Sequence, residues 1–257
     1  MSAGWFAGGD SVRGAAHYAE GLPNQDAIAF ANAPVPVVAI ADGHGSPQYV
    51  RSDVGAEIAV AVAVEILPEF VGAALDDEPL RTRVADRIVA SWTERVLAHL
   101  AAHPFLKSER DVAFGDPLYA YGATLIAVAV DDGKLLGVQI GDGDLLVHDH
   151  ATQRLFERDP RFVMNGTTSL CQPDAREELR ATRRDAPPGT LVIAATDGYA
   201  NSFVSDRDFV QIGDDYAAMI RQDGFAGVLG RLPEILAETT RDGSGDDITV
   251  GILYRDR

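Results

Sequence analysis

The chain has 257 residues, of which 46% are hydrophobic and 24% are charged, and its formal net charge is -17 at pH 7. This length is enough for one large core, and we expect a single domain over residues 1–257. A surface this acidic repels nucleic acid and anionic lipid, so we expect neither nucleic acid nor a membrane as a partner. The single cysteine, Cys171, excludes an intrachain disulfide and fits a reducing compartment.

The chain also lacks the usual signals for export or membrane insertion. Its first ten residues contain no basic segment followed by an apolar one, so no signal peptide is expected. The longest apolar stretch, around residues 58–67, is too short and too charged to span a membrane. We therefore expect a cytoplasmic protein.

The first half of the chain contains two predicted strands followed by two predicted helices. Residues 27–30 and 37–41 are short apolar runs bounded by turn residues, which is typical of strands. Apolar residues then recur at every fourth position over 54–70 and again over 80–100, which predicts two amphipathic helices. We expect a polar loop over 103–117.

The second half returns to strands and ends with another pair of helices. Strands are predicted at 123–130, 135–140, 145–148, 191–195 and 248–254, and helices at 206–221 and 225–240. The first two of these strands form a predicted hairpin, and the charged segment 157–188 is expected to be a flap. The pattern predicts an α+β fold, a four-layer α-β-β-α sandwich in which two mainly antiparallel sheets are flanked by helix pairs.

Aspartates stand at the ends of several of these strands. Asp42, Asp142 and Asp197 each follow a strand and precede a glycine, and Asp246 lies just before the last strand. If the last strand runs antiparallel to the other three, all these carboxylates reach one edge and need a compensating cation. Hard oxygen ligands suit Mg²⁺ or Mn²⁺, and no group of His or Cys has the spacing of a zinc site.

An Asp-Gly pair after a strand is also an ordinary turn. We interpret the sequence at 131–133 in that way. The other pairs differ from it because each follows a deeply apolar run, and because His44 adjoins the first.

Six short motifs resemble those of the type 2C protein phosphatases, the metal-dependent serine/threonine phosphatases. They occur in the order and approximate spacing of that family, from about His17 to Tyr254, and its fold agrees with the sandwich predicted above. The resemblance implies hydrolysis of phosphoserine and phosphothreonine on phosphorylated proteins by a metal-activated water. The motifs are Asn24-Gln25-Asp26-Ala27, Asp42-Gly43-His44-Gly45, Gly122-Ala123-Thr124-Leu125, Gly141-Asp142-Gly143, Thr196-Asp197-Gly198 and Gly245-Asp246-Asp247-Ile248-Thr249-Val250.

Carried over by motif, the resemblance implies a centre of two Mn²⁺ or Mg²⁺ ions with a possible third. Asp42 would bridge both ions, the Gly43 carbonyl would bind one, and Asp197 and Asp246 would hold the other. Asp26 and the residue before it, Gln25, would act through metal-bound waters, and Asp142 would contribute to a third, weaker site. His44 resembles the residue proposed as the general acid toward the leaving alkoxide, where a proton donor helps a poor leaving group.

Two positions depart from the pattern. Gln25 stands where many members carry Glu, and Gly21 stands where the family usually has a phosphate-binding Arg. Arg13 and His17 lie nearby and are candidates to contact the substrate phosphate in its place, the alternative for each being an ordinary solvated surface position. Together with residues 165–170 in the flap, these features resemble a less studied bacterial branch of the family. A basic cluster that follows is either an ordinary solvated face or a contact for a phosphopeptide or regulator: Arg176, Arg180, Arg183 and Arg184.

Two other functions stay open on the sequence alone. A weakly active or inactive relative could act as a phosphoprotein-binding regulatory module, an alternative raised by the two departures. A small phosphomonoester could also replace the phosphoprotein as the substrate. We expect a monomer.

Overall fold

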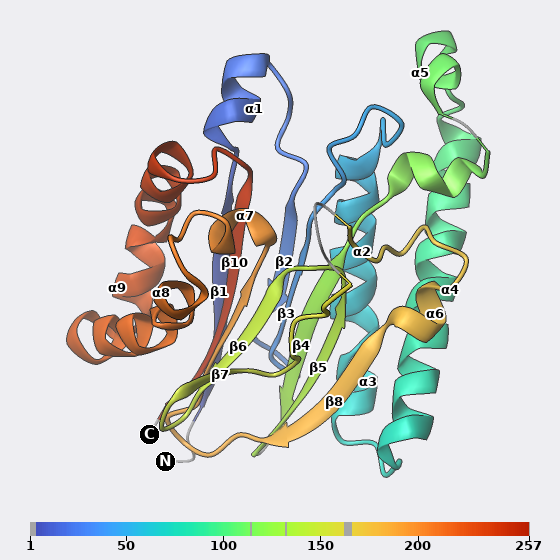
Figure 1. Ribbon diagram of the computed structural model, residues 1–257. Coiled ribbons are helices and arrows are strands. Elements are labelled where there is room, and N and C mark those ends of the chain that lie inside the picture. Colours follow the sequence, from blue (N-terminus) through green and yellow to red (C-terminus); the bar gives the residue numbers. More distant parts are fainter. Residues whose placement is uncertain (1–3, 114, 132, 162–165, 257) are drawn as a thin grey trace.

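The computed structural model describes residues 4–113, 115–131, 133–161 and 166–256. Two five-stranded sheets face each other, and every strand pair is antiparallel (Figure 1). One sheet has the order β1-β10-β9-β6-β7: β1 Trp5–Val12, β10 Ile248–Arg255, β9 Leu191–Ala195, β6 Asp144–His148 and β7 Thr152–Arg154. The other has the order β2-β3-β4-β5-β8: β2 Ala27–Ala31, β3 Val37–Ala41, β4 Leu125–Asp131, β5 Lys134–Ile140 and β8 Arg180–Asp185.

Helices cover the outer face of the sheet that contains β3. The two amphipathic repeats fold as α2 (Ser52–Ile66) and α4 (Asp77–Ala102), with the short α3 (Pro68–Val71) after α2 (Figure 1). Buried Trp92 fastens the two long helices together, because its indole Nε1 donates to the Gly55 carbonyl at 3.0 Å.

The outer face of the other sheet is covered by α9 (Ile212–Asp242), with α7 (Asp197–Ala200) and α8 (Asp206–Val210) beside it (Figure 1). Gly224 interrupts α9 with a φ of 75° and a ψ of 163°, so two helices meet there at a kink. This is the break that the sequence predicted between residues 221 and 225.

Alternating side chains of β3 build two of the three apolar cores. Val37 and Ala39 point to the helices α2 and α4, whereas Val38 and Ile40 point to the opposite sheet. A third core lies between α9 and its sheet. Three cores separate four layers, which confirms the predicted α-β-β-α sandwich.

Several parts of the chain differ from the expectations. β1 and α1 (Ala15–Glu20) were not predicted, because residues 5–20 show neither an apolar run nor a helical repeat. The loop expected at 103–117 contains α5 (Lys107–Val112) and the start of a 3₁₀ helix (Pro117–Tyr121). The predicted strand at 145–148 does not continue the sheet of its preceding hairpin but pairs in the other sheet.

The segment 157–188 is only partly a flap. It contains α6 (Ala175–Glu178) and the edge strand β8, which pairs with β5. The polar sequence of β8 suits an edge strand, because one side of an edge faces solvent. Two positions named in the sequence analysis lie outside the described residues: Asn165 of the motif over 165–170, and Asp132 of the turn at 131–133. Within the described part of the chain, no helix has the length and apolar character needed to cross a membrane.

Candidate metal centre and active site

The Asp42–Gly45 loop begins where β3 ends. Two backbone contacts hold it: the Gly43 amide donates to the Gln25 carbonyl at 3.1 Å, and the His44 amide donates to the Gly122 carbonyl at 3.1 Å. Glycine is required at 43, because a Cβ there would lie 2.6 Å from the Gln25 oxygen. The loop geometry is therefore set by the chain packed around it.

Four of the predicted carboxylates line one cavity of about 1040 Å³. Asp42, Asp142, Asp197 and Asp246 all face it, together with Gly43. The strand arrangement explains this meeting, since β10 runs antiparallel to β9 and so begins where β9 ends. Asp26 is not among the lining residues and lies behind them, where its Oδ2 accepts a hydrogen bond from Thr196 Oγ1 at 2.8 Å.

The described residues balance only part of the negative charge in this cluster. Burial, together with neighbouring negative charges, raises the pKa of Asp26 and of Asp42 well above the usual value for a carboxyl. The same causes raise the pKa of Asp197 to about 6, and burial raises the pKa of Asp142. Carboxylates held in this way favour a bound cation, which would stabilise their ionised forms.

The donor set fits Mg²⁺ or Mn²⁺ by its chemistry. The candidate donors are carboxylate and carbonyl oxygens, which these hard cations prefer. Among the described residues, no three His, Cys, Asp or Glu side chains are arranged as a ready-made ion site. The case for a cation in this cavity is therefore the uncompensated charge of the oxygen ligands.

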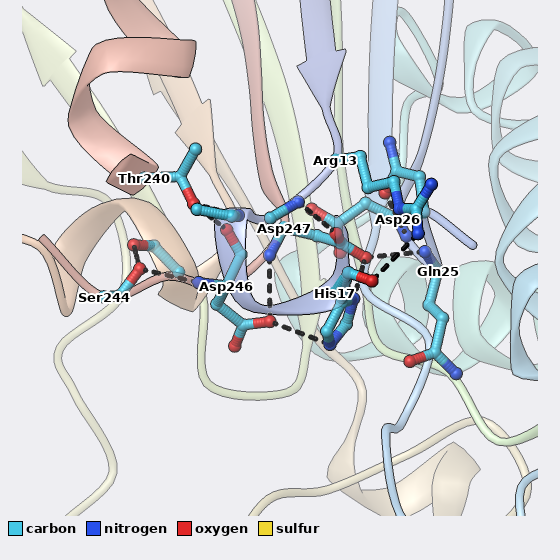
Figure 2. A network of polar contacts seen from close by, with 12 residues as sticks. Arg13, His17, Gln25, Asp26, Thr240, Ser244, Asp246 and Asp247 are labelled. Atoms are coloured by element: carbon cyan, nitrogen blue, oxygen red, sulfur yellow. Dashed lines mark hydrogen bonds and ion pairs between the residues drawn. The ribbon is translucent and has the colours of Figure 1, made fainter. Parts of the chain in front are cut away.

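Asp247 holds the parts of the site together from behind. Its buried carboxylate accepts hydrogen bonds from the Gly14 amide at 2.6 Å and the Gln25 amide at 2.7 Å, and it pairs with His17 Nδ1 at 3.0 Å (Figure 2). Asp246 is half-exposed, and its Oδ1 lies 3.7 Å from His17 Nε2. Of this adjacent pair, Asp246 is therefore the one free to bind a ligand from the cavity.

The two candidates for substrate-phosphate contact are placed differently. His17 lines the cavity. Arg13 is not among the described residues that line it, because its Nη2 donates to the His17 carbonyl at 2.8 Å (Figure 2). Its guanidinium carbon also lies 4.9 Å from the centre of the Tyr18 ring. The geometry therefore disfavours Arg13 in this role.

Gly21, the position of the family's arginine, ends α1. Its φ of 76° lies in the left-handed region, and its amide and that of Leu22 donate to carbonyls of the last helical turn. The position that would carry a phosphate-binding side chain therefore ends the helix, and the residue of α1 that reaches the cavity is His17.

His44 lines the cavity and packs edge-on against Tyr49, with 4.7 Å between the ring centroids. Burial lowers the pKa of His44 to about 4. The imidazole of His44 is therefore neutral at pH 7. The role of His44 as general acid stays a prediction.

Gln25 does not aim its amide freely into the cavity. Its Nε2 donates to Ser52 Oγ at 2.8 Å, at the start of α2. The amide that replaces the usual carboxylate therefore fastens α2 to the Asp42–Gly45 loop.

The basic cluster predicted in the flap is engaged by the chain itself. Arg183 donates to three carbonyls at residues 70–75, Arg184 pairs with Asp149, and Arg176 pairs with Asp86. These contacts favour the ordinary structural interpretation.

Three further polar residues belong to the cavity, of which Arg158 and Asn201 were not predicted and Thr167 was noted only as part of the motif over 165–170. Thr167 Oγ1 donates to Asp142, Asn201 Nδ2 donates to Asp197, and Arg158 also lines the cavity. Asn201 lies one helical turn after Asp197, a spacing that could have indicated the contact. Arg158 and Thr167 lie in the irregular segment, where no periodicity marks a residue.

Comparison with known proteins supports the family and the fold. The sequence model of the protein phosphatase 2C family matches residues 13–237. No curated protein matches the sequence.

Solved structures share the fold at low sequence identity. The catalytic domain of the serine/threonine phosphatase PstP, in complex with two manganese ions, is 19% identical, with a TM-score of 0.63 and full coverage of both chains. PppA of Pseudomonas aeruginosa is 18% identical, with a TM-score of 0.62 and 98% of each chain covered. The S. agalactiae serine/threonine phosphatase is 15% identical, with a TM-score of 0.63 and 97% of this chain and 99% of that one covered. On the match over residues 13–237, the chain belongs to the protein phosphatase 2C family.

Proposed function

We propose that this phosphatase hydrolyses phosphoserine and phosphothreonine on proteins at the cavity where strands of both sheets end, with Mn²⁺ or Mg²⁺ as the cofactor. The observation that carries the proposal is the group of carboxylates around Asp42, Asp197 and Asp26, whose pKa values are raised by burial and mutual repulsion. Membership of the family supports the activity and its dependence on a metal.

Each residue has a proposed part in the reaction. Asp42 would hold both ions of a binuclear centre, the Gly43 carbonyl would bind one, and Asp197 and Asp246 would bind the other. Asp26 would orient water from behind Asp42, and Asp142 would serve a third, weaker ion. When bound, two divalent cations would lower the pKa of a water molecule and neutralise the negative charge of the phosphoryl oxygens.

The chain's own groups would orient the reaction and handle its proton. The neutral imidazole of His44 can donate an N–H hydrogen bond toward the leaving oxygen of the substrate serine or threonine. Tyr49 fixes the plane of that ring, and the Gly122 carbonyl fixes its backbone. Proton transfer by His44 would require uptake of a proton when the substrate binds.

The proposal includes a monomeric, cytoplasmic protein acting on phosphoproteins. The free, buried Cys171 is compatible with a reducing compartment.

A metal-depletion and add-back assay tests the function. The protein is stripped with a chelator, and phosphate release from a phosphothreonine peptide is measured with and without Mn²⁺ or Mg²⁺. We expect metal-dependent release that falls by at least about 100-fold in Asp42→Ala and Asp197→Ala. Asp185→Ala is the matched control, because this exposed aspartate ends a strand far from the cavity.

Three outcomes would contradict the proposal in different ways. If wild type and Asp42→Ala released phosphate at the same rate, the active site would not lie in this cavity. Peptide binding without any release would indicate the regulatory module. Faster hydrolysis of small phosphomonoesters than of phosphopeptides, compared by kcat/KM, would change the substrate class.

A further inference from the structure

The cavity is acidic, yet its proposed substrate carries a doubly charged phosphate. The family's arginine is replaced by Gly21, and Arg13 is turned away toward the His17 carbonyl. Among the described residues that line the cavity, Arg158 is the one arginine or lysine. It is therefore the permanent cation available there.

Arg158 is held in place by two carboxylates. Its Nη2 and Nε donate to the buried Asp144 at 2.7 and 3.3 Å, and its Nη1 lies 3.2 Å from Asp206. The guanidinium carbon also lies 5.8 Å from the centre of the Phe209 ring. These contacts orient a side chain that is 48% exposed.

The anchoring leaves donors unused. A guanidinium has five N–H groups, and the two hydrogen bonds to Asp144 use the Nε–H and the N–H of Nη2 on the same edge. The other N–H of Nη2 and one N–H of Nη1 form the end edge, a forked pair that can bind two oxygens of a phosphate, and Asp206 lies beside Nη1 as an ion-pair partner.

Arg158 lines the same cavity as the proposed ion ligands Asp142 and Asp197. The adjacent cavity residue, Asp159, does not cancel the charge of Arg158, because its carboxylate is bound by Arg161 through contacts of 2.6 to 3.0 Å. Arg158 thus has a free forked edge beside the proposed ion ligands.

We propose that Arg158 binds the phosphoryl group of the substrate, from the segment after β7 rather than from the N-terminal motif. This inference rests on the proposed function, whose phosphate-containing substrate it serves. Asp144 acts as the positioning residue, since it fixes the guanidinium from inside the sandwich.

Arg154 provides a matched comparison. It contacts the same two carboxylates, Asp144 and Asp206, and lies 5.7 Å from the centre of the same Phe209 ring. However, Arg154 is not among the described residues that line the cavity. A loss of the charge network would affect both arginines, whereas a loss of phosphate contact would affect Arg158 alone.

The test measures binding of inorganic phosphate by calorimetry in Mg²⁺, together with kcat and KM for a phosphothreonine peptide. We expect Arg158→Gln to weaken phosphate binding by about 10- to 100-fold, the range for charge-assisted hydrogen bonds. Arg158→Lys should restore part of the loss, because lysine keeps the charge but not the fork. Arg95→Gln, whose side chain pairs with Glu65 and is not among the described residues that line the cavity, should bind phosphate as the wild type does.

The melting temperature of each variant is measured in parallel, so that a folded variant can be told from an unfolded one. Wild-type affinity for phosphate in folded Arg158→Gln would overturn the inference. An equal loss in folded Arg154→Gln would also overturn it, since the effect would then belong to the network. Calorimetry needs no turnover, so an inactive wild type would contradict the proposed function while the phosphate titration still tested Arg158.

Discussion

Asp246 and Asp247 have identical side chains, yet the fold gives them different surroundings. Asp247 is buried and accepts hydrogen bonds from two backbone amides (Figure 2). These bonds join the start of β10 to the residues just before α1 and just before β2. Asp246 is half-exposed and faces the cavity. At the scale of single residues, one aspartate stabilises the site and its neighbour is available for a ligand.

Replacing each aspartate with asparagine separates these roles. We expect Asp247→Asn to lower the free energy of unfolding of the metal-free protein by about 1–3 kcal/mol, because an amide group replaces an acceptor oxygen and leaves a buried N–H unpaired. Asp246→Asn should change that free energy by less than about 0.5 kcal/mol but weaken Mn²⁺ binding. Urea unfolding and calorimetry measure the two effects. Equal destabilisation by both changes would refute the distinction.

The pKa of Asp197, raised to about 6, predicts a pH dependence for cation binding. A cation binds the ionised carboxylate, so below pH 6 it must displace a proton. Mn²⁺ affinity should therefore rise with pH and be roughly tenfold weaker at pH 5 than at pH 7.5 from this group alone. Without metal the sign is opposite: the raised pKa favours the folded state at low pH, and that contribution is lost as the pH rises through about 6.

Titrations of Mn²⁺ at a series of pH values measure this dependence. The Asp197→Asn variant, which has no proton to displace at this position, is the control and should show a shallower slope. A wild-type affinity that stays constant from pH 5 to pH 7.5 would exclude the raised pKa.

At the scale of elements, α1 shows how a short helix changes the site. The helix ends at Gly21 in the left-handed region, and no atom lies within 4 Å of where a Cβ would stand. The cost of any side chain there is therefore a backbone cost rather than a steric clash with neighbours.

Restoring the family's arginine tests this conclusion. We expect Gly21→Arg to lower the free energy of unfolding by about 1 kcal/mol, since an L-residue is strained in the left-handed region. Gly21→Asn should cost less, because asparagine tolerates that region better. Urea denaturation of both variants gives the comparison, and an unchanged stability of Gly21→Arg would show that α1 can end in another way.

The elements also differ in how far their sequences predicted them. β3 is apolar over its whole length and α2 and α4 repeat every fourth residue, so each was predicted from its own pattern. β1 contains Gly8, Gly9 and Asp10 and has no such pattern; it is a strand because all eight of its residues pair with β10. β8 is an arginine-rich edge strand for a similar reason, its pairing with β5.

At the scale of the whole molecule, the two sheets share a core. Side chains of β3 and β4 meet those of β9 and β10 between the sheets. Separating the halves would expose this apolar surface, so we propose that the chain unfolds as one domain.

The two tryptophans allow the halves to be followed separately. Trp5 lies on β1 and packs against the shared core, whereas Trp92 lies on α4 in the core between the helices and their sheet. The Trp92→Phe variant therefore reports on β1 and the shared core through Trp5, and Trp5→Phe reports on the other half through Trp92. In each variant we expect the fluorescence midpoint in urea to coincide with the circular dichroism midpoint. Two separate midpoints within one variant would show two independently unfolding units.

The sequence by itself determined the layered fold and the placement of aspartates at strand ends. Both follow from local patterns, because apolar periodicity and turn residues are written in neighbouring positions. The tertiary structure alone decided the different roles of Asp246 and Asp247, the turning away of Arg13 and the arrival of Arg158 in the cavity. These depend on contacts between segments far apart in the chain, and no local pattern specifies such contacts.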